Sequence, residues 1–153
     1  MIRSEQEFVK ALERLEQDKS VLERQRAQLQ ELGLQGEQLA RALQPMESFH
    51  DQLREEVEMF EGMKRGDLGA LHNLTSIGRW LIGIRIAKGL TQQELADRLG
   101  VAASQVSRDE NNDYHAISVE RAQRILEALG VQFEAHLAGP IIEDVDRNEF
   151  VGA

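Results

Sequence analysis

A row of polar side chains between residues 103 and 109 has the clearest capacity for chemistry in this sequence. If this segment is a helix, Val106 points inward, while Ser104, Ser107 and Arg108 point outward. Hydroxyl and guanidinium groups form hydrogen bonds, and an arginine can bond two acceptors of one planar partner such as a guanine base. The row therefore predicts recognition by hydrogen bonds on a helix surface.

Two short helices joined by a tight turn would hold this row in place. Thr91 is a good N-cap, and Glu94 three residues later completes the pattern of a capping box. Gly100 suits the left-handed backbone that ends such a helix, and Val101 follows it as the apolar residue of the turn. Residues 89–110 are therefore predicted to form a helix-turn-helix, a motif that places its second helix in the DNA major groove.

The same stretch resembles the Cro and lambda-repressor-type (XRE) helix-turn-helix family over residues 77–131. The resemblance is carried by GLTQQELA, LGV and QVSRDE, with ISVERAQRILEALGV as a closing helix. It implies that Ser104, Ser107 and Arg108 match positions that reach base edges in family members. The full set of predicted contacts with double-stranded DNA is Thr91, Gln92, Ala103, Ser104, Gln105, Ser107, Arg108, Tyr114 and His115.

The predicted contacts differ in kind. Arg108 is the strongest candidate, because its fork can bond guanine through two hydrogen bonds. Gln105 lies at the edge of the exposed face, where it would touch bases or phosphates. Thr91 and Gln92 match the start of the first motif helix, whose free N–H groups point at a phosphate in family complexes. Ala103 stands where relatives often have a polar residue, which removes a readout bond.

The loop after the second helix departs from the family pattern at Asp113, where relatives often have Lys or Arg. This carboxylate would repel phosphate unless it is paired or turned inward. Tyr114 and His115 would then donate to phosphate, although packing of the loop is an equal alternative for Tyr114. Arg85 and Glu110 match a pair that forms a salt bridge in relatives, which would fix the recognition helix rather than read bases.

Residues 1–64 are predicted to form an antiparallel helical hairpin, similar to a coiled coil, that serves oligomerisation or partner binding. Apolar residues recur at heptad spacing over residues 4–32 and 37–63, with a glycine-containing turn between the two segments. Pro45 is expected to kink the second helix or to mark its true start. Residues 65–76 are predicted to be a linker.

The periodicity changes after the closing helix, which ends the predicted domain at residues 77–130. From Val131 to Leu137, apolar residues alternate with polar ones, which predicts a short β-strand over residues 131–138. Many relatives have a fifth helix there. Because a lone strand leaves its backbone groups unpaired, we expect it to pair with its symmetry mate in a homodimer. Residues 139–153 are predicted to be an acidic tail.

The composition argues against several other classes of protein. The net charge is −9, but residues 77–130 contain seven acidic and seven basic residues, which implies modest non-specific affinity for DNA. Cysteine is absent and the four histidines lack metal-ligand spacing, so we expect no catalysis, no metal and no cofactor. No apolar run approaches the ~20 residues of a membrane span, and the first residues lack the apolar core of a secretion signal. We therefore expect a cytoplasmic protein.

The combined prediction is a mainly α-helical chain with a hairpin, a four-helix helix-turn-helix domain and a short C-terminal strand. Its predicted function is sequence-specific DNA binding as a dimeric transcriptional regulator, a repressor that excludes polymerase sterically. One alternative is an antitoxin that binds its own operator while the hairpin or tail neutralises a toxin. Another is an interaction adaptor whose degenerate helix-turn-helix no longer binds DNA.

Overall fold

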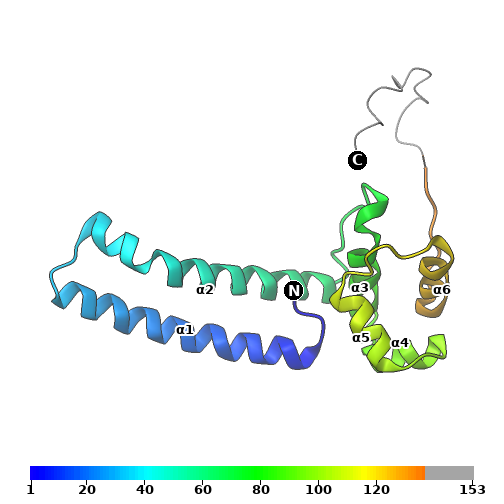
Figure 1. Cartoon of the computed structure of the whole chain (residues 1–153), viewed down its shortest axis with the longest axis horizontal. Helices are drawn as coiled ribbons and strands as arrows, with labels where there is room; N and C mark the ends of the chain where they lie inside the picture. Colours follow the sequence, from blue (N-terminus) through cyan, green and yellow to red (C-terminus); the bar gives the residue numbers. More distant parts are fainter. Residues whose placement is uncertain (137–153) are drawn as a thin grey trace, which may run out of the picture.

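The computed structural model describes residues 1–136, which contain six α-helices and one 3₁₀ turn. A hairpin of two long helices projects from a group of four short ones (Figure 1). The elements are α1 (Glu5–Glu31), α2 (Gly36–Lys64), the 3₁₀ turn η1 (Leu74–Ser76), α3 (Ile77–Ala87), α4 (Gln92–Leu99), α5 (Ala103–Asn111) and α6 (Val119–Leu129). Among the described residues, no helix is both long and apolar enough to cross a membrane.

The predicted antiparallel hairpin is present, with α1 and α2 side by side along their length (Figure 1). α1 begins where the Ser4 hydroxyl accepts the N–H of Glu7 at 3.2 Å. α2 runs through Pro45, so the alternative that this proline marks the start of the helix is wrong. The early part of α2 bends, as expected for a helix with an internal proline (Figure 1). The part of α2 before the bend packs against α1 and buries Leu39 and Leu43.

The root of the hairpin shares one hydrophobic core with the four short helices. Ile2, Val57 and Phe60 belong to the same buried cluster as Leu81 of α3 and Leu95 of α4. The rings of Phe8 and Phe60 stack at 5.0 Å within the hairpin. This shared core sets the position of the hairpin relative to the helix-turn-helix.

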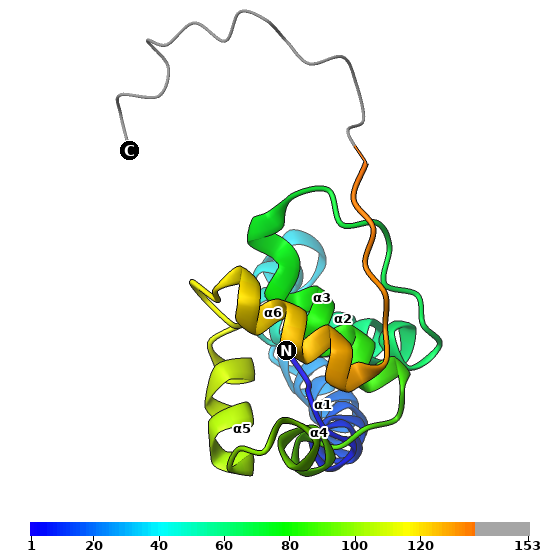
Figure 2. The same cartoon turned by 90° about the vertical axis from the view of Figure 1, so that its right-hand side faces the viewer.

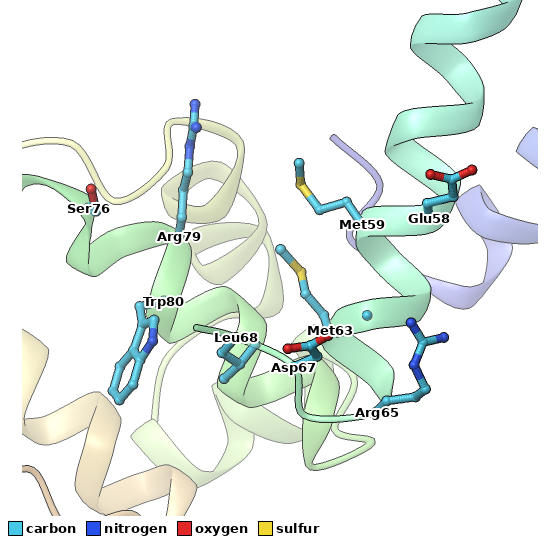
Figure 3. A pocket seen from close by; sticks show the side chains of 10 residues that line it. Glu58, Met59, Met63, Arg65, Asp67, Leu68, Ser76, Arg79 and Trp80 are labelled. Atoms are coloured by element: carbon cyan, nitrogen blue, oxygen red, sulfur yellow. The ribbon is translucent and has the colours of Figure 1, made fainter. Parts of the chain in front are cut away.

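The segment that joins the hairpin to α3 also packs against the domain. A Cβ added at Gly83 would lie 2.5 Å from Cδ2 of Leu68, so the glycine in α3 makes room for this linker residue. Leu68, Met63 and Trp80 line a pocket of about 420 Å³ at the junction (Figure 3). The linker is therefore partly built into the fold.

The four short helices pack around apolar faces that recur at helical spacing. α3 carries the densest buried face, and α6 covers it. The buried residues of this core are Leu81, Ile82, Ile84 and Ile86 of α3, Leu95 and Ala96 of α4, Val106 of α5, and Ala122, Ile125, Leu126 and Leu129 of α6. The core leaves the polar face of α5 outside.

The predicted C-terminal strand is absent from the part of the chain that the structure describes. Residues 131–136 have no strand assignment, and no other segment of residues 1–136 pairs with them. Alternating side chains are not sufficient for a strand, because the backbone also needs a partner for its hydrogen bonds. Instead, Phe133 places its ring edge-on to Trp80, with centroids 6.4 Å apart. Leu137, the end of the strand prediction at residue 138 and the predicted tail at residues 139–153 lie outside the described residues.

Candidate nucleic-acid interface

The outer face of α5 presents the polar row that the sequence predicts. Ser104 and Arg108 are exposed one turn apart, while Val106 is buried in the core. Nε of Arg108 donates to the carbonyl of Ser104 at 3.2 Å, which lays the guanidinium along the helix. Gln105 and Ser107 flank this face and are half-buried. α5 therefore offers hydroxyl and guanidinium donors to a partner outside the domain.

The start of α4 is a complete capping box. Thr91 Oγ1 accepts the N–H of Glu94 at 3.1 Å, and Oε2 of Glu94 accepts the N–H of Thr91 at 2.7 Å. The bond from the Thr91 backbone holds the pKa of the Glu94 carboxyl below its usual range. The N–H groups of Gln92 and Gln93 belong to the first turn, where a helix has no internal acceptor. They remain suited to an anion such as phosphate.

The turn between α4 and α5 is held by Gly100, which ends α4 in left-handed backbone with φ of 67°. Other residues adopt this conformation at a cost, because their Cβ crowds the backbone. The N–H of Val101 then donates to the carbonyl of Ala96 at 3.0 Å. α5 follows from Ala103, which is half-buried beside α4.

A buried ion pair joins α5, the second helix of the helix-turn-helix, to the rest of the domain. Arg85 donates from Nε to Oε1 of Glu110 at 2.6 Å and from Nη2 to Oε2 at 2.7 Å. The two side chains are 3% and 0% exposed, respectively, so water does not satisfy them. Nε2 of Gln92 adds a third hydrogen bond to this carboxylate at 2.9 Å. The pair implied by the family resemblance is present, and it links α3, α4 and α5.

Asp113 in the loop after α5 is paired rather than free. Its carboxylate accepts from Nη2 of Arg3 at 2.9 Å and from Nε of Arg79 at 3.1 Å. Partial burial alone would raise the pKa of this carboxyl, but the hydrogen bonds from the two arginines outweigh it and lower the pKa. The loop charge that would repel phosphate is thus neutralised by two guanidinium groups.

The two aromatic residues predicted for phosphate contact lie in different environments. Tyr114 is 6% exposed, and its hydroxyl is buried without a hydrogen-bond partner among residues 1–136. Burial and then the carboxylates of Glu110 and Asp109 raise the pKa of this phenol. This position fits the loop-packing alternative and removes the hydroxyl from the surface. His115 is exposed beside it.

Two features near the recognition helix were not predicted from the sequence. Arg121 of α6 pairs with Asp109 of α5. The start of α1 also lies near α4 and α5 (Figures 1 and 2), and residues 3–6 line one pocket together with residues of both helices. Arg3 supplies its carbonyl to Nη2 of Arg85 at 2.9 Å. No local pattern could have revealed this contact, because the two residues lie 82 positions apart.

Metal ligands do not gather anywhere in residues 1–136. No group of three or more His, Asp or Glu side chains there could hold an ion. The histidines lie apart, in α2, the linker, the α5–α6 loop and the segment after α6.

The domain geometry and the family comparison agree. Residues 81–135 match the model of the helix-turn-helix family of the Cro/C1 type, also called XRE. The match contains most of α3, the complete α4–turn–α5 unit and α6. No curated protein and no solved structure matches the chain significantly. Residues 81–135 therefore match a helix-turn-helix domain of the XRE type, a family of DNA-binding regulators, and the hairpin stands outside the match.

Proposed function

We propose that the protein is a sequence-specific transcriptional regulator that binds operator DNA in the cytoplasm as a dimeric repressor. The observation that carries this proposal is the exposed Ser104–Arg108 face of α5, on a helix fixed by the buried pair of Arg85 and Glu110. Bound at a promoter, such a dimer would exclude polymerase.

In this proposal, α5 reads bases and the start of α4 holds the backbone. Arg108 bonds a guanine edge, and Ser104 bonds a neighbouring base. Ser107 and Gln105 contact the rim of the groove, and Ala103 offers an apolar contact to a thymine methyl group. The Thr91 cap presents the N–H groups of Gln92 and its neighbour to one phosphate, and His115 reaches another. Tyr114 contributes by packing the loop.

Dimerisation would place two copies of α5 about one DNA turn apart, as helix-turn-helix dimers require. We propose that the segment after α6 contacts its symmetry mate in this dimer, because residues 132–136 are exposed. The molar mass from light scattering on the full chain and on a chain ending at Gly130 tests whether this segment is needed for the dimer. If both are dimers, the hairpin is the better candidate.

Operator selection followed by an affinity series tests the function. Duplexes are selected from a random library with the full chain, and binding is measured over a range of salt. We expect Arg108→Ala to weaken specific binding by about 1–3 kcal/mol and to relax preference at one base pair. Arg24→Ala is the matched control, because Arg24 also donates from Nε to a serine carbonyl four residues earlier, but in the hairpin.

Three results would contradict the proposal. If no duplex is enriched over competitor DNA at low salt, the protein is not a sequence-specific regulator. If Arg108→Ala binds the selected operator as well as wild type does, α5 meets DNA through another face. Equal losses from Arg108→Ala and Arg24→Ala would mean that the effect is a general loss of positive charge.

The hairpin favours a second candidate, an antitoxin that represses its own operon while binding a toxin. Val9, Leu12, Phe49 and Met59 are large apolar residues of the hairpin that are 42% to 72% exposed. Such residues suit contact with a protein partner. Purification from the native host and co-expression with neighbouring genes test this candidate. A toxic neighbour that is rescued by the full chain would support it, whereas an adaptor would bind a partner without binding DNA.

A further inference from the structure

The DNA-reading surface and the start of the N-terminal hairpin line a common pocket. This pocket has a volume of about 580 Å³. One wall is formed by residues 3–6, before and in the first turn of α1, together with Phe60 of α2. The opposite wall includes Gln92, Gln93, Ala103, Ser104 and Ser107. Several of the residues that we assign to DNA therefore line a space that is already bounded by another part of the chain.

The N-terminal wall is anchored to the domain by specific contacts. Ile2 is 5% exposed and belongs to the shared core. The carbonyl of Arg3 accepts from Arg85, and its guanidinium pairs with Asp113. These contacts hold the residues before α1 against α3 and the loop after α5, and so place the start of α1 near α4 (Figure 2).

This arrangement conflicts with the approach of a duplex. The major groove is about 12 Å wide and an α-helix with side chains is about 10–12 Å across, so the groove admits one helix and not a second element beside it. The first turn of α1 also carries Glu5 and Glu7, and the side chain of Glu5 is 62% exposed. Glu5 lines the pocket and is paired with Lys64 at 2.5 Å, so a phosphate strand that approaches the start of α4 would meet this ion pair before it reached the helix.

One hydrogen-bond donor of the N-terminal wall has no acceptor within residues 1–136. Nε of Arg3 is buried without a hydrogen-bond partner among the described residues. A buried donor without an acceptor costs free energy, which lowers the cost of moving the segment away. This donor offsets part of the stabilisation that buried Ile2 and the hydrogen bonds of Arg3 give to the segment.

We propose that residues 1–8 form an autoinhibitory cover at one edge of the DNA-reading face, where Ser104 and Ser107 line the shared pocket while Arg108 stays exposed, and that operator binding requires their displacement. This inference rests on the proposed function of α5. A partner or second copy that binds the hairpin would then control access to DNA by moving this segment. When the open form is a minor fraction, the apparent dissociation constant rises in inverse proportion to that fraction.

The test frees the segment without changing any charge. Ile2→Ser removes the buried apolar anchor, and Val9→Ser is the matched control on an exposed residue of α1. With the operator selected above, we expect Ile2→Ser to bind about 10-fold more tightly than wild type, and Val9→Ser to be unchanged. Circular dichroism and thermal melts establish that each variant is folded.

A reversible cross-link tests the same inference without loosening the fold. The chain has no cysteine, so Gln6→Cys and Gln93→Cys introduce the sole thiols, on opposite walls of the pocket. We expect a cleavable bis-thiol reagent that bridges them to weaken operator binding at least 10-fold, and cleavage of the bridge to restore it. The unbridged double variant is the control for the substitutions themselves.

The outcomes separate the inference from the function on which it rests. If wild type binds an operator but Ile2→Ser and the bridged protein bind it equally well, the cover is refuted and the function stands. Weaker binding by folded Ile2→Ser would show that the segment positions α5, which also refutes the cover. If no protein binds specifically, the freed variant included, the proposed function fails and the cover with it.

Discussion

Glu110→Ala should remove a large fraction of the stability of the helix-turn-helix domain. In the structure, the carboxylate accepts two hydrogen bonds from Arg85 and one from Gln92, and none of its surface is exposed. After its removal, Arg85 retains the carbonyls of Leu90 and Arg3 but has no counter-charge. Breaking a buried pair in this way costs about 3–5 kcal/mol. Because total stabilities are about 5–15 kcal/mol, the loss is a large fraction.

The assay is urea unfolding of wild type, Arg85→Ala, Glu110→Ala and the double variant. Each single change leaves a buried charge unpaired, whereas the double change removes both charges. We therefore expect the double variant to lose less than the sum of the singles, by about 1–3 kcal/mol. Arg41 and Glu37, an exposed pair in the hairpin, form the control cycle, for which we expect about 0.5 kcal/mol or less.

Strict additivity in the Arg85–Glu110 cycle would refute the reasoning. The two losses would then be independent, and the pair would not act as a unit. A coupling as small as that of the control cycle would lead to the same conclusion. A changed slope against urea in one variant would instead indicate altered two-state behaviour, and free energies from that variant would not be compared.

Three further predictions concern packing and pH. Gly78→Ala should cost more than about 2 kcal/mol in thermal unfolding, because its Cβ would lie 1.8 Å from the backbone oxygen of Asp113. Gly83→Ala should stay within about 1 kcal/mol of wild type, because its Cβ would press on the movable side chain of Leu68 and otherwise touch Met63 at an ordinary distance. Folding lowers the pKa of the Asp113 carboxyl, so this group stabilises the folded protein above the pKa that it has in the unfolded chain. That stabilisation is lost as the pH falls through the pKa of the folded state. In Asp113→Asn, the midpoint of urea unfolding should therefore change less between about pH 5 and pH 2 than it does in wild type. Tyr114→Phe should leave stability unchanged or raise it slightly in the same urea assay, because the buried hydroxyl has no partner among residues 1–136; a large loss would reveal a hidden hydrogen bond.

The features that the sequence predicted correctly depend on residues close together in the chain. Thr91 and Glu94 form their capping box within one helical turn, and Gly100 ends α4 through its own backbone freedom. The ion pair of Arg85 with Glu110 spans 25 positions, and it was predicted because the family resemblance supplied it. Local chemistry and a known motif together were enough for the helix-turn-helix.

The features that were missed depend on contacts between distant segments. Apolar and polar residues alternate after Val131, and this pattern concerns side chains only. A strand also needs a second segment to pair with its backbone, and the sequence of one segment does not show whether that partner exists. Nothing around Arg3 indicates that its carbonyl meets Arg85, and nothing around Gln92 indicates that its amide turns inward to Glu110. These contacts become visible only when the helices are packed.

The core shared by the hairpin root and the short helices has a consequence for cooperativity. Val57 and Phe60 belong to the same buried cluster as α3 and α6, whereas Leu39 and Leu43 are buried outside that cluster, farther along the hairpin. Amide hydrogens near Phe60 should therefore exchange only on global unfolding, while those near Leu43 exchange through local opening. The cooperative unit then includes the root of the hairpin, and a fragment that starts at α3 would expose the apolar surface that this root covers.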